Sequence, residues 1–200
     1  MLDYMRITAG YARGILLGAP KSDATRPATD AARLALFSSV GGAVESARCL
    51  DLFSGTGAYG LEAASRGAAE VVLVENNRNA FKILKSNIDA VLKCADAAGI
   101  GRAKVEAVCA DCLKCGGRLG GGRFDFVFAD PPYAMLSDGV FCKKLADLFC
   151  EVGSVGTLFM LEAPAEFAFE RLGNGRFELV KRLGKTSKGK PSQIIFKIRQ

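Results

Sequence analysis

The stretch RCLDLFSGTGAYG, residues 48–60, joins a short apolar run to a glycine-rich turn and then to a helical pattern. Residues 48–53 predict a buried strand, and residues 59–66 predict a helix. Between them the glycines follow the spacing G-x-G-x-x-G, which in this strand–turn–helix context is typical of a nucleotide-cofactor loop. Glycine suits such a loop because it lets the backbone come into contact with a ligand.

Strand and helix patterns alternate along the chain from this unit onward. The strands are expected at residues 48–53, 71–75, 105–109, 124–129 and 157–161, and the helices between them at 59–66, 79–93 and 140–152. Alternation of this kind predicts parallel strands joined by helical crossovers, in a Rossmann-like, doubly wound α/β sheet. The strand runs are nearly continuous in apolar residues, as expected for strands that are covered on both faces.

Both ends of the chain depart from the alternation. Residues 177–180 and 194–198 predict two strands without a helix between them, so they should form a C-terminal antiparallel hairpin and complete a mixed sheet of about seven strands. Residues 6–19 predict a small extended arm, followed by a helix through Phe37 with Thr29 as its N-cap. We therefore expect an N-terminal arm and helix over residues 1–45 and a main domain over residues 46–200.

The charge is positive and unevenly distributed. The chain has 27 basic and 21 acidic residues, for a net charge of +6. Basic residues gather in the first 35 positions and again at 181–190. A polyanionic partner would explain both groups, since clustered cations bind phosphates by releasing counterions, and two solvated basic surfaces would explain them equally well. No apolar run approaches the about 20 residues of a membrane span, and the N-terminus lacks a secretory core, so a cytoplasmic protein without a membrane partner is expected.

Seven cysteines and no histidine limit the possible metal chemistry. Cys49, Cys142 and Cys150 lie in apolar segments and are expected to be reduced, buried thiols. Residues 109–115 contain C-x-x-C-x-x-C, which allows an iron–sulfur or zinc site, or simply reduced thiols at a strand end. Because only Cys94 is near enough to be a fourth ligand, we expect no metal.

Acidic residues follow the predicted strands and narrow the choice of cofactor. Glu75 ends the second strand, where it can accept hydrogen bonds from ribose hydroxyls, and a simple tight turn would not require Asp51 or Glu75. Dinucleotides and S-adenosylmethionine both fit such a loop. Asp51 favours S-adenosylmethionine, because a carboxylate would repel a pyrophosphate and attract the cationic amino-acid part. Asp111 could border the adenine, or it could simply form a turn.

The segment ADPPYA, residues 129–134, follows the strand expected at 124–129. Two prolines hold the backbone stiff and extended after the strand. The Asp130 carboxylate and the Pro131 carbonyl could accept hydrogen bonds from both N–H groups of an exocyclic amine, which would direct the nitrogen lone pair at a methyl donor. Pro132 keeps that geometry rigid, and Tyr133 offers a face on which a flipped base can stack.

DPPY resembles the [D/N]-P-P-[Y/F/W] signature of methyltransferases that act on amino groups of adenine, cytosine, guanine or glutamine. The segments RITAGYARG, TRPATDAARLALF, LDLFSGTGAYGLEAASRGAAEVVLVE and FDFVFADPPYA resemble, in order and spacing, the bacterial small-subunit (16S) ribosomal RNA guanine-N2 methyltransferase family. The resemblance implies methyl transfer from S-adenosylmethionine, leaving S-adenosylhomocysteine, to the 2-amino group of one guanine in an assembling small subunit. We also expect a monomer that needs no metal.

The resemblance assigns roles to particular residues. Those expected to hold the cofactor are Asp51, Phe53, Gly55, Gly57, Glu75, Asn76, Asp111 and Cys112. Those expected to hold the base and perform catalysis are Asp130, Pro131, Pro132 and Tyr133. Those expected to face RNA are Arg6, Arg13, Arg26 and Lys185. Three features depart from the family pattern, namely SGTG in place of AGSG, Ala28 in place of threonine, and the added segment SKGKPS.

Other functions use part of the same pattern. An amino-group methyltransferase acting on adenine in DNA or RNA, or on protein glutamine, would need the same DPPY segment. A non-catalytic RNA-binding module would not need an intact Asp130 or glycine loop. A nicotinamide oxidoreductase would explain the loop and leave residues 130–133 without a role.

Overall fold

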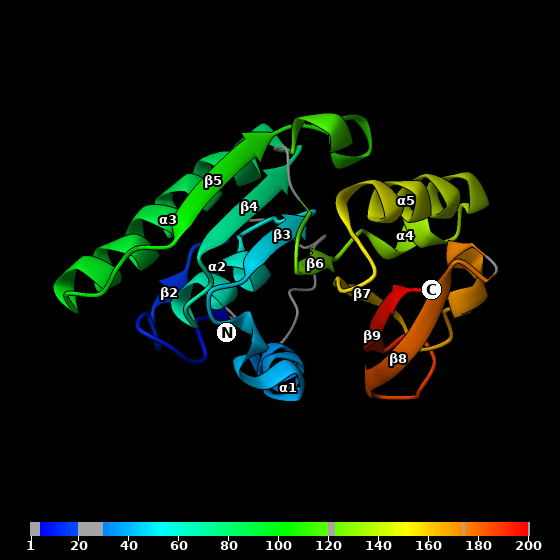
Figure 1. Cartoon of the computed structure of the whole chain (residues 1–200), viewed down its shortest axis with the longest axis horizontal. Helices are drawn as coiled ribbons and strands as arrows, with labels where there is room; N and C mark the ends of the chain where they lie inside the picture. Colours follow the sequence, from blue (N-terminus) through cyan, green and yellow to red (C-terminus); the bar gives the residue numbers. More distant parts are fainter. Residues whose placement is uncertain (1–4, 20–29, 120–122, 174, 200) are drawn as a thin grey trace.

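The computed structural model describes residues 5–19, 30–119, 123–173 and 175–199. Its centre is a seven-stranded sheet with the order β5-β4-β3-β6-β7-β9-β8 (Figure 1). The parallel strands are β3 (Arg48–Leu52), β4 (Glu70–Glu75), β5 (Lys104–Cys109), β6 (Phe126–Ala129) and β7 (Leu158–Pro164). The antiparallel pair is β8 (Phe177–Gly184) and β9 (Pro191–Ile198), at the opposite end of the sheet from β5. The predicted fold class is confirmed.

The strand order reverses between β3 and β6, and this reversal determines where a ligand can bind. The chain proceeds from β3 outward through β4 to β5 and then returns to place β6 on the other side of β3. Leu52 and Ala129, the last residues of the two central strands, are register partners. The loops that follow β3 and β6 therefore begin side by side at the carboxyl edge of the sheet, where open α/β sheets bind their ligands.

Helices cover both faces of the sheet (Figure 1). One apolar cluster joins β3, β4 and β6 to α1 (Asp30–Val40), α2 (Ala58–Ser65) and α3 (Arg78–Ala97). The other joins the same sheet to α4 (Tyr133–Leu136) and α5 (Gly139–Val152), with an aromatic centre formed by Phe149, Phe159 and Phe196. Short 3-10 turns cover Gly41–Val44, Cys112–Lys114, Gly116–Arg118 and Phe169–Leu172.

The predicted N-terminal arm is a small antiparallel ladder of β1 (Met5–Arg6) and β2 (Leu16–Leu17). Its connecting segment is fixed to α2 by the buried Glu62 side chain, which accepts hydrogen bonds from the Thr8 and Ala9 backbone N–H groups at 2.7 and 3.1 Å. The arm therefore belongs to the same apolar cluster as α2. Helix α1 continues beyond Phe37 to Val40, and Thr29, its expected N-cap, lies outside the described residues.

Several strands extend further than expected. The structure places β7 over residues 158–164 and the hairpin strands over 177–184 and 191–198. The strands are longer because β7 and β9 pair with each other. Their hydrogen-bonded ladder continues to the Pro164–Pro191 register pair, beyond the apolar residues of either strand. Among the described segments, no helix is long and apolar enough to cross a membrane.

Candidate active site

The loop after β3 has backbone dihedral angles that residues other than glycine rarely adopt. Phe53 has φ 60°, and Gly55 and Gly57 have φ 54° and 83°. A positive φ is strained for a bulky residue such as phenylalanine, and strain of this kind gathers at functional sites. The Phe53 ring packs against Phe141 of α5, with ring centroids 6.1 Å apart. The loop is thus a constrained turn leading from β3 into α2.

The three glycines of the loop are needed for different reasons. A Cβ on Gly57 would lie 2.6 Å from Leu84 Cδ1, and one on Gly60 would lie 2.6 Å from Leu73 Cδ2. These two positions therefore let α2 pack closely on the sheet and on α3. A Cβ on Gly55 would come within 4 Å of only the Phe53 carbonyl oxygen, at 4.0 Å. Gly55 faces open space, so its lack of a side chain leaves room for a ligand to reach the backbone.

Two carboxylates hold this loop in place. Asp51 is 1% exposed and accepts a hydrogen bond from the Gly60 N–H at 2.9 Å. Glu75, partly buried at the end of β4, accepts from the Gly55 N–H at 2.8 Å and from the Asn77 N–H at 2.6 Å. The expectation that a structural turn would not use Asp51 or Glu75 is therefore wrong. An ionised carboxylate has about four lone-pair positions, so Glu75 retains acceptor capacity for a ligand.

Burial changes the ionisation of Asp51. Desolvation raises the pKa of Asp51 to about 7, with a further increase from the charge of Glu75, while the hydrogen bond from Gly60 lowers it. A cation held beside Asp51 would favour the ionised carboxylate. This environment suits a ligand that carries a positive charge.

The other expected cofactor residues lie at the ends of β4 and β5. Asn76 is exposed directly after β4. Asp111 follows β5, caps a 3-10 turn by accepting from the Leu113 N–H at 3.1 Å, and lies 3.4 Å from the Lys114 ammonium. Cys112 is buried in an apolar cluster rather than open to the loop. Because Glu75 and Cys109 are register partners, Asp111 belongs to the same sheet edge as Glu75.

Residues 130–133 follow β6 at this carboxyl edge. Asp130 is partly buried, Pro131 is buried, Pro132 is exposed, and Tyr133 begins α4. Burial raises the pKa of Asp130 well above its usual range, and the charges of Glu162 and Asp51 raise it further. The structure thus brings the DPPY segment and the glycine loop together at the ends of adjacent strands, as the sequence predicts.

The expected RNA-facing residues do not all lie at this edge. Lys185 is exposed in the turn between β8 and β9, and this turn lies at the carboxyl edge because β9 starts at the Pro164–Pro191 pair. Arg13 is exposed in the arm, whose Tyr11 N–H donates to the carbonyl of Ser65 at the far end of α2. The exposed Arg6 side chain lies 3.2 Å from Asp30, and Arg26 lies outside the described residues.

The cysteines are separate thiols. Cys49 and Cys142 are buried and Cys150 is partly buried. Cys109 is exposed, whereas Cys112 and Cys115 are buried, and burial raises the pKa of the Cys112 thiol to about 12. Within the described part of the chain, no group of three or more His, Cys, Asp or Glu side chains is placed to hold a metal ion.

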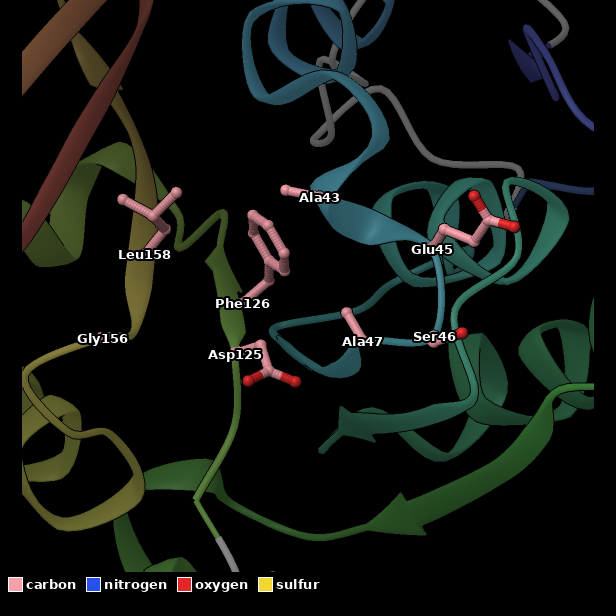
Figure 2. Close-up of a pocket in the computed structure, with 8 residues that line it drawn as sticks. All are labelled: Ala43, Glu45, Ser46, Ala47, Asp125, Phe126, Gly156 and Leu158. Carbon is pink, nitrogen blue, oxygen red and sulfur yellow. The ribbon is translucent and has the colours of Figure 1, made fainter.

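A surface pocket lies at the other edge of the sheet. Figure 2 shows its lining residues, which come from the segment before β3, the start of β6 and the start of β7. Asp125 and Phe126 contribute at the amino end of β6, whereas Asp130 follows its carboxyl end. Because the glycine loop and residues 130–133 do not line it, this pocket is not the candidate active site.

Three buried polar residues that order the surroundings of the site belong to no motif in the sequence. Asn87 of α3 hydrogen-bonds to both backbone groups of Gly18 and to the Thr56 carbonyl. Glu62 holds the arm, and Glu162 lies in β7, two residues before its end, beside Asp130. The available signal was a lone polar residue within an otherwise apolar pattern, as in Leu158–Ala163 for Glu162.

Comparison with known proteins gives one family and close structural matches. The model of the family described as conserved hypothetical protein 95 matches residues 5–181. Over 129 residues the chain is 36% identical to "Ribosomal RNA small subunit methyltransferase D" of Escherichia coli K12, a match that covers 64% of this chain and 60% of that protein. The match thus spans about three fifths of the relative's length.

Two solved structures match almost end to end. The Escherichia coli protein yhhF is 26% identical with a TM-score of 0.76, and the match covers 98% of each chain. The hypothetical protein TTHA0928 of Thermus thermophilus is 30% identical with a TM-score of 0.71, covering 97% of this chain and 99% of that one. These matches agree with the mixed sheet and the C-terminal hairpin described above.

Proposed function

We propose that this chain, which belongs to the family described as conserved hypothetical protein 95, transfers a methyl group from S-adenosylmethionine to the exocyclic 2-amino group of a guanine in small-subunit ribosomal RNA. The observation that carries the proposal is the meeting of two loops. The glycine loop follows Leu52 and the DPPY segment follows Ala129, and these two residues are register partners at the centre of the sheet. A methyl donor in one loop and an amine in the other would therefore be neighbours.

The residues of the glycine loop fit S-adenosylmethionine. Open space at Gly55 accommodates a ligand against the backbone, and Glu75 retains lone pairs for ribose hydroxyls. Asp51 lies under the loop, where its charge favours a cationic amino-acid group. Phe53, Asn76 and Asp111 complete the proposed cofactor residues around the ends of β3, β4 and β5. Cys112 follows Asp111, and because its side chain is buried, only its backbone could contact the cofactor. When bound, the cofactor supplies an electrophilic methyl group.

The DPPY segment would prepare the amine as the nucleophile. The Asp130 carboxylate and the Pro131 carbonyl accept hydrogen bonds from its two N–H groups, so that the nitrogen lone pair points at the methyl group. Asp130 needs to be ionised for this task, and a nearby sulfonium charge would favour that state against the effect of burial. Tyr133 stacks with the base, and Pro132 fixes the backbone between them. After transfer, the methylated amine loses a proton to Asp130 or to water.

The proposed partner is RNA within an assembling small ribosomal subunit, bound by a monomer in the cytoplasm. The exposed Lys185 supports contact beside the site, because its turn lies at the same edge as Asp130. Arg6 and Arg13 are also exposed in the arm, within the N-terminal segment 1–45 to which we assign RNA contact together with Arg26. Clustered cations of this kind bind a phosphate backbone.

Radiolabelled methyl transfer from S-adenosylmethionine to unmodified small subunits, followed by nucleoside analysis, tests the proposal. Labelled N2-methylguanosine is expected with the wild-type protein and should disappear with Asp130→Ala, while the affinity for S-adenosylhomocysteine is retained. Asp125→Ala is a matched control, since it removes an exposed carboxylate at the other end of the same strand. Labelled methyladenosine, or label in protein alone, would retain the chemistry and refute the guanine substrate.

A further inference from the structure

Glu162 is a buried carboxylate beside the residues to which we assign base binding. It is 3% exposed and follows Leu161 in β7. Leu161 is the register partner of Ala129, so Glu162 and Asp130 come next to each other at the ends of neighbouring strands. Alternation along each strand places both side chains on the sheet face that is covered by α1 and α2.

The Glu162 carboxyl group joins the DPPY segment to the interior of the protein. Its Oε2 atom accepts a hydrogen bond from the Tyr59 hydroxyl at 2.7 Å, and that hydroxyl accepts one from Gln193 Nε2 at 2.9 Å. The Tyr59 ring stacks on Phe128, with centroids 5.8 Å apart. The Tyr133 hydroxyl also interacts with this carboxyl group and lowers its pKa. A buried hydrogen-bond network of this kind rigidifies the groups that it joins.

Charged and titratable groups face Glu162 from several elements. They are Tyr59 of α2, Tyr133 of α4, Arg33 of α1 and Asp130 after β6, with Asp51 of β3 acting on Asp130. Burial raises the pKa of Glu162, whereas the two tyrosine hydroxyls and the charge of Arg33 lower it. In turn, the charge of Glu162 raises the pKa of Asp130.

We propose that Glu162 is a positioning residue for methyl transfer. It holds the Tyr133 ring on which the target base stacks, and it places a negative charge beside the Asp130 carboxylate. This proposal rests on the function proposed above. A buried acid costs free energy that an apolar side chain of similar size would not. Its place beside Tyr133 and Asp130 gives that cost a use: once methyl transfer has removed the sulfonium charge that keeps Asp130 ionised, the charge of Glu162 suits Asp130 to take the proton that the methylated amine releases.

The test compares Glu162→Gln with the wild-type protein in single-turnover methylation of small subunits across a range of pH. Glutamine keeps the shape and an acceptor oxygen but removes the charge. We expect the rate to fall at least tenfold, with the affinity for S-adenosylhomocysteine changed less than twofold. The acidic limb of the pH profile should move to lower pH, because Asp130 loses the neighbouring charge that raises its pKa. A purely structural role would not move that limb.

Glu178→Gln is the matched control, since Glu178 is an exposed carboxylate on β8 that pairs with Lys197 at 3.5 Å. Its rate and pH profile should equal those of the wild type. An unchanged rate and limb in Glu162→Gln would overturn the positioning role while wild-type activity still supports the proposed function. Absence of methylation by the wild type would instead refute that function. If Glu162→Gln does not fold, Tyr133→Phe replaces it, and a wild-type rate in that variant overturns the proposal.

Discussion

Alanine substitutions at Gly55 and Gly57 should separate the ligand role of the glycine loop from its packing role. Both residues have a positive φ, so alanine costs about 1–2 kcal/mol of folding free energy at either position. At Gly57 the new Cβ would also lie 2.6 Å from Leu84 Cδ1 and 3.0 Å from Leu61 Cδ1, in a fully buried part of the core. Overpacking of this kind adds about 1–3 kcal/mol.

The expected loss in the free energy of unfolding is therefore about 2–5 kcal/mol for Gly57→Ala and about 1–2 kcal/mol for Gly55→Ala. The loss of affinity for S-adenosylhomocysteine should instead be larger for Gly55→Ala than for Gly57→Ala. The Cβ on Gly55 enters the open space that we assign to the cofactor, so the Kd for S-adenosylhomocysteine should rise at least tenfold. In Gly57→Ala, the affinity of the folded protein should fall less.

Urea unfolding and isothermal titration calorimetry measure the two quantities on the same preparations. Equal stability losses in the two variants would refute the packing argument for Gly57. Binding of S-adenosylhomocysteine by Gly55→Ala with wild-type affinity would refute the assignment of the open space at Gly55 to the cofactor. The comparison is internally controlled, because both substitutions add one methyl group to the same turn.

Three further predictions concern buried polar groups. Burial raises the pKa of Asp51 to about 7. Cofactor affinity should therefore fall as the pH is lowered below about 7, because protonation removes the charge that attracts the ammonium group. Titration calorimetry should find no such pH dependence in Asp51→Asn. Asn87→Ala removes hydrogen bonds to Gly18 and Thr56 and should cost about 2–4 kcal/mol in urea unfolding, and a loss below about 0.5 kcal/mol would contradict this. Glu62→Ala should increase hydrogen exchange in the arm at residues 8–9, and unchanged protection there would show that the arm is held otherwise.

Local patterns were sufficient to predict the strands of the main sheet and the longer helices of this fold. The apolar runs identified the central strands, and the strand–glycine–helix unit at residues 48–60 predicted the turn from β3 into α2. These predictions succeeded because backbone geometry couples near neighbours: helices and strands have their own side-chain periods, and glycine permits a positive φ. Strand ends were less predictable, as at Pro164, because the ladder with β9 extends them beyond their own apolar runs.

The site was predictable where its residues lie in short motifs. Residues 51–60 and 130–133 are each continuous in sequence, and the rule that ligands bind at the carboxyl edge brings them together. The assignment of Arg13 to RNA contact came from the clustered charge and the family resemblance, and the structure places this residue at the far end of α2, because its arm is fixed to Ser65. The sequence shows that a segment is basic, but it does not show on which part of the surface the fold will place that segment.

By itself, the sequence determined the α/β alternation, the glycine loop and the rigid DPPY segment, because each depends on residues that are close along the chain. Only the tertiary structure decided that Glu162 lies between Asp130 and Tyr59, and that Asn87 joins Gly18 to Thr56. These contacts link segments from 31 to 103 residues apart. A buried polar group must find its partners wherever the fold brings them, and those partners are set by strand order and packing rather than by local sequence.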